Sequence, residues 1–297
     1  MGIHIGVDLG GTNVRVAIVQ PDGEVEQMMQ EATEAERGSE YTINKMIEMI
    51  ETISEGQTIE GIGIGAPGPL DPEKGVILSP PNLPGWDNVP LTDQLQAHFD
   101  TEVKLNNDAN AAALAEAQFG GGQGYKSVFY ITVSTGVGGG FVLDGKVVNG
   151  AQGYAGEIGN MILNPHGYQY SNLNKGSLES YSSGTAIAER FFERFGQQGG
   201  AEDVFELVSQ GNEKAQQIVD EAVEYLAMGI ANITHIVNPD VFVIGGGVMS
   251  AGDLIWVPLR DRVEDYLYPG LVPTMNLKPA ALSGEAGVIG ASLLTKQ

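Results

Sequence analysis

The sequence predicts an α/β protein with two lobes, because it contains two strand hairpins of one plan and is long enough for two cores. The first hairpin spans residues 6–19 with a turn at Gly10 and Gly11, and the second spans residues 131–143 with a turn at Gly136. Each combines an apolar strand, a glycine-rich turn that carries a hydroxyl group, and a second apolar strand. At 297 residues, 42% of them apolar, the chain exceeds a typical single domain. We therefore expect an internal repeat, with one hairpin in each lobe.

The other elements of the first lobe follow in order. Apolar residues at helical spacing predict a helix over residues 43–53, and residues 59–64 are typical of a strand. Residues 78–89 form a proline-rich loop, which is either a plain surface connector or a carrier of ligand contacts, for which Asn82 and Trp86 are the candidates. A helix is expected to begin at Asp108 and to end at the glycines of residues 120–122, which we interpret as a hinge.

The second lobe is expected to begin with a strand over residues 127–133 and to continue with helices over residues 185–195 and 201–209. A longer helix follows, and we interpret its apolar stripe as core. The stripe consists of Ile218, Ala222, Leu226, Ile230, Ile233 and Val237. A short strand over residues 241–244 then leads to a third glycine turn at residues 245–247.

The glycine turns fit phosphate binding. Without a Cβ atom, Gly10 and Gly11 let backbone N–H groups and the Thr12 hydroxyl approach an anion closely. Asp8, at the end of the strand, is placed to position a Mg²⁺ ion that bridges phosphates. An ordinary β-hairpin explains either turn by itself. None of the three turns has the P-loop pattern or opens a helix with G-x-G-x-x-G, so neither a Walker fold nor a dinucleotide-binding fold is indicated.

Together the three turns resemble the phosphate-1, phosphate-2 and adenosine motifs of the actin, Hsp70 and sugar-kinase superfamily, which has a ribonuclease H-like fold. Four further segments narrow the resemblance to the ROK family of bacterial sugar kinases and sugar-responsive repressors, and to its glucokinase branch. These segments are residues 63–71, 81–86, 105–113 and 155–159. They occur in the family's order over nearly the whole chain. The resemblance implies an ATP- and Mg²⁺-dependent hexose kinase that converts glucose to glucose 6-phosphate.

The resemblance also implies the domain organisation. The C-terminal helix of the family corresponds here to residues 286–295 and is expected to return to the first lobe. We therefore expect an N-terminal lobe of residues 1–119 completed by residues 285–297, a C-terminal lobe of residues 120–284, and an interdomain cleft for the ligands. The family further implies a homodimer.

The resemblance assigns the site residue by residue. Asp108 matches the catalytic aspartate that acts as base, although an aspartate at a helix start is also a preferred N-cap. The substrate-binding set is Gly68, Asn82, Asn107, Asp108, Glu157, Asn160 and Glu179. The nucleotide-binding set is Asp8, Gly10, Gly11, Thr12, Asn13, Thr135, Gly136, Gly245 and Gly246, with Asp8 reaching Mg²⁺ through the phosphates. Taken singly, the asparagines are also typical of turns and the glutamates of solvated helices.

One departure from the family pattern concerns zinc. The family's histidine and three cysteines, which form a structural zinc site, stand here as Asn160, Tyr170, Asn172 and Ser177. Tetrahedral zinc needs such nitrogen and sulfur ligands, and His166 alone is a poor ligand set. We therefore expect no structural zinc and a loop packed by Tyr168, Tyr170 and Tyr181.

The same departure leaves the substrate open. The family's histidine also contacts the sugar, so with Asn160 in its place fructose, mannose, N-acetylated hexosamines and allose remain alternatives to glucose. A protein that senses a sugar without turning it over is a further alternative, although it would be expected to lose the base or a phosphate turn. An actin-like or chaperone ATPase would lack the predicted sugar contacts.

Composition excludes other classes. The chain has 15 basic and 38 acidic residues, a net charge of −23, which disfavours partners such as nucleic acid and anionic membranes. The charge fits either a solvated acidic surface or a salt-tolerant host. No apolar run reaches the roughly 18 residues of a membrane span, and no leader or basic recognition helix is found. With no cysteine, the sequence fits a cytoplasmic enzyme outside the repressor branch.

Overall fold

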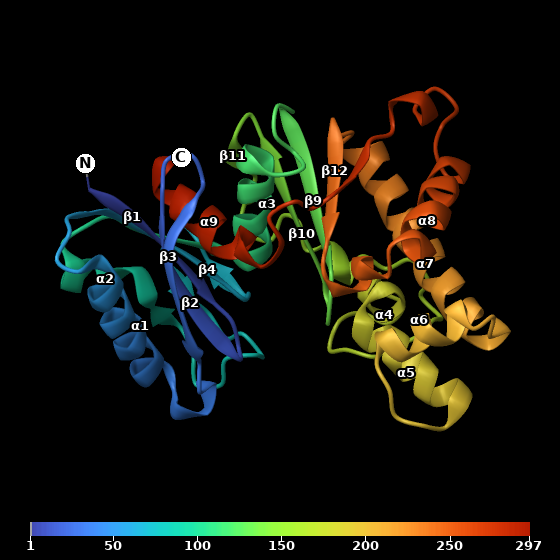
Figure 1. Ribbon diagram of the computed structural model, residues 1–297, viewed down its shortest axis with the longest axis horizontal. Helices are drawn as coiled ribbons and strands as arrows, with labels where there is room; N and C mark the ends of the chain where they lie inside the picture. The colour runs from blue at the N-terminus through green and yellow to red at the C-terminus, as the bar shows by residue number, and fades with distance from the viewer. Residues whose placement is uncertain (1) are drawn as a thin grey trace. The chain divides into compact units, whose positions relative to one another are not determined.

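The structure is a computed structural model that describes residues 2–297. The chain forms two compact units, whose elements are labelled in Figure 1. Unit 1 contains the residues up to Tyr130 together with Gly140–Gly156 and Ala281–Gln297. Unit 2 contains Ile131–Gly139 and Glu157–Ala280.

A five-stranded sheet forms the centre of unit 1, with the strand order β3-β2-β1-β4-β8. The strands are β1 (Ile3–Leu9), β2 (Asn13–Val19), β3 (Val25–Ala32), β4 (Ile59–Ala66) and β8 (Val103–Asn107). β1 and β2 form the expected antiparallel hairpin, while β1, β4 and β8 run parallel to one another. Since parallel strands end at the same edge of a sheet, the residues that follow β1, β4 and β8 lie along one edge. Ligands of open α/β sheets bind beyond this carboxyl edge.

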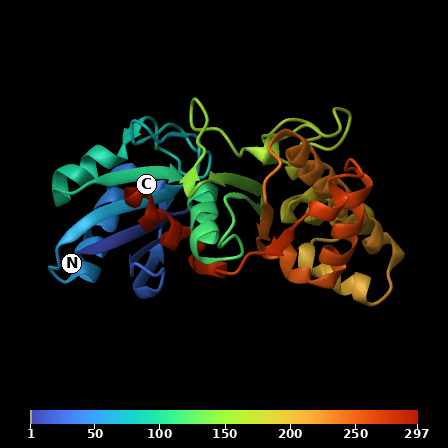
Figure 2. The same ribbon diagram turned by 90° about the horizontal axis from the view of Figure 1, so that it is seen from above.

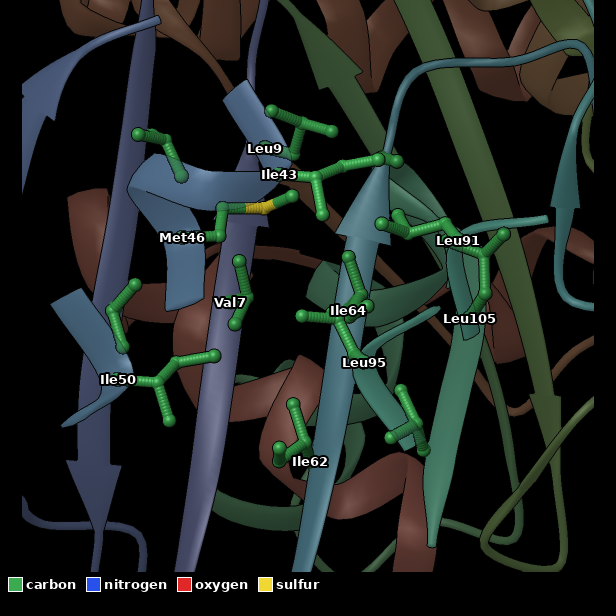
Figure 3. Close-up of a cluster of buried hydrophobic side chains, with 14 of the residues drawn as sticks. Val7, Leu9, Ile43, Met46, Ile50, Ile62, Ile64, Leu91, Leu95 and Leu105 are labelled. Atoms are coloured by element: carbon green, nitrogen blue, oxygen red, sulfur yellow. The ribbon is translucent and has the colours of Figure 1, made fainter. Parts of the chain in front are cut away.

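Helices α1 (Ser39–Ser54) and α2 (Leu91–Phe99) cover one face of this sheet. Figure 3 shows the core between these helices and the sheet, in which Val7 and Ile64 of the strands face Met46 of α1 and Leu95 of α2. The predicted helical stripe is confirmed, because Ile43, Met46, Ile50 and Ile53 are buried and Ile47 packs against the cluster.

The other face of the sheet carries α3 (Asp108–Phe119) and α9 (Ala286–Leu293). The C-terminal helix, drawn in red, lies against the strands of unit 1 (Figure 1 and Figure 2). Its backbone approaches the sheet where glycines stand, since a Cβ atom at Gly6 would lie 1.9 Å from the Val288 carbonyl oxygen and one at Gly63 would lie 1.7 Å from that of Ala291. Only glycine permits this approach.

Three short strands form a small sheet in unit 1, in the order β5-β6-β7. They are β5 (Leu70–Asp71), β6 (Val76–Ile77) and β7 (Val89–Pro90). The proline-rich loop between β6 and β7 is anchored by the side chains of Leu83 and Trp86, which are both 1% exposed. The expectation that Trp86 contacts a ligand is therefore wrong, because its ring packs in the hydrophobic core of unit 1. This anchoring fixes the segment that carries Asn82.

A second five-stranded sheet has the order β11-β10-β9-β12-β13. Its strands are β9 (Ser127–Val133), β10 (Val137–Leu143), β11 (Lys146–Val147), β12 (Val241–Gly245) and β13 (Leu277–Pro279). The helices of unit 2 are α4 (Glu179–Ser182), α5 (Gly184–Phe195), α6 (Ala201–Ser209), α7 (Glu213–Ile236) and α8 (Asp253–Asp265). The short 3-10 turns are η1 (Ala35–Arg37), η2 (Ile158–Asn160), η3 (Gly247–Ala251), η4 (Val272–Thr274), η5 (Ser283–Glu285) and η6 (Leu294–Lys296).

The predicted elements of the second lobe are confirmed with small shifts. β9 and α6 have the expected bounds, and α5 begins one residue early at Gly184 because Ser183 caps it through the Ala186 N–H group. The expected stripe of α7 is buried from Ile218 to Ile233, whereas Val237 lies beyond the last helical residue and is only half-buried. Within residues 2–297, no helix has the length and apolarity that a membrane crossing requires.

Candidate active site

The first glycine turn, at residues 10–12, is built by contacts within unit 1. The Gly10 N–H group donates to the Asn13 carbonyl oxygen at 2.9 Å, which closes the turn, and Thr33 donates both to Gly10 and to Thr12. A Cβ atom at Gly11 would lie 2.8 Å from the Asn82 carbonyl oxygen. The structure therefore brings the predicted nucleotide residue Gly11 against the loop that carries the predicted sugar contact Asn82.

Asp8 lies next to this turn and faces Arg15 across the hairpin, with 3.5 Å between its Oδ2 and the Arg15 Nη2. Burial raises the pKa of Asp8, and the Arg15 guanidinium partly offsets that rise. α9 begins beside it, since a Cβ atom at Gly287 would lie 2.8 Å from the Asp8 carboxylate. A nearby cation favours the charged form of such a buried carboxylate, as Arg15 does here.

The junction between β8 and α3 presents Asn107 and Asp108. Asn107 is the N-cap of α3, and its Oδ1 accepts the Ala109 N–H group at 2.9 Å. Asp108 is the first helical residue, and its Oδ1 also accepts from Ala109, at 2.7 Å. The alternative interpretation of Asp108 as the N-cap is therefore wrong, because Asn107 occupies that position.

A network of asparagine side chains, which the sequence analysis missed, supports this junction. The Asn106 Oδ1 accepts the Asn107 N–H group at 2.8 Å and the Asn110 side-chain amide at 3.0 Å. The Asn106 amide in turn donates to Asn149 at 2.9 Å. The crowding of asparagines at residues 106–110 was a signal in the sequence, but nothing local indicated Asn149.

Gly68 lies in the loop after β4, two residues beyond Ala66, which pairs with Asn107 in the β4–β8 ladder. The predicted residues of unit 1 thus gather at the carboxyl edge of its sheet. They are Asp8, Gly10, Gly11, Thr12, Asn13, Gly68, Asn82, Asn107 and Asp108.

The second glycine turn, at residues 134–136, belongs to unit 2. The Gly184 N–H group donates to the Ser134 carbonyl oxygen at 2.7 Å, so the start of α5 holds the turn. The third turn packs beside it, because a Cβ atom at Gly246 would lie 2.3 Å from the Val133 carbonyl oxygen. Gly246 has φ of 96°, a conformation that favours glycine.

Two carboxylates accompany this turn. Glu179, the first residue of α4, accepts the Val137 N–H group at 2.9 Å through its Oε2. Glu157 precedes η2, and its pKa is raised by burial and, to a smaller extent, by the negative charge of Glu179. Two carboxylates that sense each other's charge are suited to accept hydrogen bonds from the hydroxyl groups of a ligand.

Asn160 ends η2, and its Oδ1 accepts the Asn174 N–H group at 2.8 Å. This bond joins η2 to the loop in which the family's cysteines are replaced. The side-chain oxygen of Asn160 is thereby engaged, which leaves the Nδ2 group as its donor toward a ligand.

Stacked tyrosines pack that loop, as predicted. The Tyr168 ring lies 5.0 Å from the Tyr170 ring and 5.1 Å from the Tyr181 ring, measured between centroids. Tyr225 of α7, which the sequence analysis missed, stacks on Tyr181 at 3.4 Å. Asn164 donates to the hydroxyl groups of both Tyr181 and Tyr225, at 2.9 and 3.1 Å.

The donor set does not fit the family's zinc. The chain has no cysteine, and the described residues contain no cluster of three His, Cys, Asp or Glu side chains that could hold a metal ion. The four positions carry neutral amide, phenol and hydroxyl groups, which are poor zinc ligands.

We therefore expect purified protein to contain far less than one zinc ion per chain. Treatment with a chelator should leave the melting temperature unchanged, and should leave activity unchanged once Mg²⁺ is restored, because aromatic packing and not metal binding holds the loop. Elemental analysis and thermal denaturation check this. Stoichiometric zinc that resists dialysis would refute it.

The glycine hairpins, the parallel strands of unit 1 and the carboxylate at the β8–α3 junction define a class of protein, the α/β proteins with the fold of actin and the sugar kinases. The chain belongs to the ROK family, whose model matches residues 4–297. It is 37% identical to a glucokinase of Thermotoga maritima, over 99% of this chain and 97% of that protein.

Solved structures agree with this. A ROK hexokinase from Thermus thermophilus is 36% identical with a TM-score of 0.91, covering 98% of this chain and 97% of that one. A ROK glucokinase from Streptomyces griseus in complex with glucose and AMPPNP is 30% identical with a TM-score of 0.83, covering the whole of both chains. The resemblance to the ROK family and the predicted fold class are confirmed.

Proposed function

We propose that the protein is an ATP-dependent hexose kinase that phosphorylates glucose. The observation that carries the proposal is the position of Asp108, a carboxylate at the carboxyl edge of the unit 1 sheet whose helix is capped by its neighbour Asn107. The similarity to glucokinases over the full length of the chain supports the same reaction.

In the proposed reaction, Asp108 accepts the proton of the sugar 6-hydroxyl group as its oxygen attacks the γ-phosphorus of ATP, and ADP leaves. Asn82, Asn107, Glu157 and Glu179 are the proposed contacts that orient the sugar. The glycine turns supply backbone N–H groups for the phosphates. Positioning of this kind provides much of the rate in phosphoryl transfer.

Asp8 fits a role toward Mg²⁺. Its carboxylate offers the oxygen ligand that Mg²⁺ prefers, beside the turn that would hold the phosphates. Mg²⁺ bound to the phosphates would neutralise the charge that develops during transfer.

A panel of hexoses in a coupled assay of ADP release tests the proposal. We expect glucose to give the highest kcat/KM among glucose, fructose, mannose, N-acetylglucosamine and allose. The expectation for glucose depends on Asn160, whose Oδ1 accepts the Asn174 N–H group and whose Nδ2 group we propose as a donor to a hydroxyl where the family uses histidine. Absence of sugar-dependent ADP release with every member of the panel would exclude the function.

We also propose that the enzyme is a cytoplasmic homodimer that feeds glycolysis, since ATP and glucose meet in that compartment. Exposed apolar side chains on unit 2 support self-association, with Ile162 52%, Ile236 81% and Tyr268 73% exposed. Ile162 lines a cavity of about 300 Å³ together with Met228 and His235, and the Tyr268 ring lies 5.0 Å from the His235 ring. Sedimentation at micromolar concentration should show twice the chain mass, and a monomer would contradict the proposal.

A further inference from the structure

Glu179, a predicted sugar contact, also contacts the second glycine turn. Its Oε2 accepts the Val137 N–H group at 2.9 Å. The same oxygen also lies close to the turn, because a Cβ atom at Gly136 would be 2.5 Å from it. One oxygen of Glu179 is therefore committed to the backbone at residues 136–137, and the other remains for a ligand.

Three backbone hydrogen bonds also hold the turn, one of them within it, since the Ser134 N–H group donates to the Gly136 carbonyl oxygen at 2.8 Å. Gly184 donates to Ser134 at 2.7 Å and Thr185 donates to Thr135 at 3.4 Å, both from the start of α5. Among the hydrogen bonds described for residues 2–297, Glu179 provides the side-chain acceptor for a backbone N–H group at this turn. Its removal would leave the Val137 N–H group, at the start of β10, without that partner.

Glu157 provides the natural comparison. It is also a predicted sugar contact, and it lies close enough to Glu179 for the two charges to interact. No hydrogen bond described for residues 2–297 joins its side chain to residues 134–137. Of these two predicted sugar contacts, only Glu179 has a described hydrogen bond to the glycine turn, and a binding experiment can test the effect of that difference.

We propose that Glu179 is a positioning residue for the nucleotide as well as a sugar contact, because it fixes the Thr135–Gly136 turn through the Val137 N–H group. This inference rests on the proposed kinase function, in which that turn binds phosphate. A carboxylate that serves only the sugar would not affect nucleotide affinity when no sugar is present.

The experiment measures AMPPNP binding with Mg²⁺ by calorimetry, without sugar, and glucose binding separately. For Glu179→Ala we expect about tenfold weaker nucleotide binding, equivalent to the loss of one hydrogen bond to a partly buried group. Glu179→Gln keeps an acceptor for Val137, so nucleotide affinity should return to within about twofold of the wild type while glucose binding stays weak. Glu157→Gln, the matched control, should weaken only glucose binding.

A reciprocal variant keeps the proposal testable if Glu179→Ala does not fold. Gly136→Ala places a methyl group against the Glu179 carboxylate, so it should weaken glucose binding in the absence of nucleotide although Gly136 belongs to the phosphate turn. Wild-type nucleotide affinity in Glu179→Ala, or wild-type glucose affinity in Gly136→Ala, would overturn the inference. Failure of the kinase function itself would be seen separately, as a wild-type enzyme that releases no ADP with any hexose.

Discussion

Replacing Asp108 by Asn is expected to lower kcat by about 10²–10⁴-fold, the usual contribution of a general base. The amide keeps the shape of the side chain and its acceptor oxygen for the Ala109 N–H group, which Asp108 engages at 2.7 Å. It cannot accept the proton of the sugar hydroxyl group. Because that loss acts on the transition state, glucose affinity should stay within about tenfold of the wild type. Steady-state kinetics together with calorimetric titration of glucose measure both quantities.

Asp100→Asn is the matched control, since Asp100 is exposed and has the left-handed conformation that asparagine also adopts readily. Its kcat should equal that of the wild type. The melting temperature of Asp108→Asn should also change little, because Asn107 caps α3. A kcat near the wild-type value in Asp108→Asn would remove Asp108 from the role of base.

Glu116→Ala is expected to cause the largest loss of stability among the substitutions considered. Glu116 of α3 is 0% exposed, and its carboxylate accepts the N–H groups of Gly121, Ala281 and Leu282 at 2.8–3.0 Å. Alanine would leave three backbone donors without their acceptor, at a cost of roughly 3–5 kcal/mol in the free energy of unfolding. That is a large part of the roughly 5–15 kcal/mol that stabilises a typical domain.

Denaturant unfolding monitored by circular dichroism measures this cost. Gln118→Ala, two residues further along α3 at an exposed position, serves as the control and should change the free energy of unfolding by less than about 0.5 kcal/mol. Glu116→Gln keeps one acceptor oxygen and should fall between the two. A Glu116→Ala protein as stable as the control would show that water replaces the carboxylate without penalty.

Local signals in the sequence were sufficient for much of the fold. The glycine turns at Gly10 and Gly136 follow apolar strands, and a turn between paired strands is a local feature of the chain. The stripe of α7 repeats at helical spacing, so its buried face could be predicted before its partners were known. Asp108 could be placed at a helix start for the same reason, although the sequence did not indicate that Asn107 would be the cap.

Contacts between distant residues could not be predicted in the same way. Glu116 binds backbone groups of Ala281 and Leu282, which are 165 and 166 residues away in the chain. Tyr225 joins the tyrosine stack from a helix whose pattern indicates only its buried face. Many residue types can contact a backbone N–H group or an aromatic edge, so the residue types at these positions do not specify the partner.

The most direct test of the account is a measurement of both products in one reaction mixture of protein, ATP, Mg²⁺ and glucose. ADP can be measured enzymatically, and the sugar phosphate can be identified by phosphorus NMR. The account predicts equal amounts of ADP and glucose 6-phosphate, with ADP release falling to a trace when glucose is omitted. ADP formed at the same rate without glucose, or with no sugar phosphate, would contradict it.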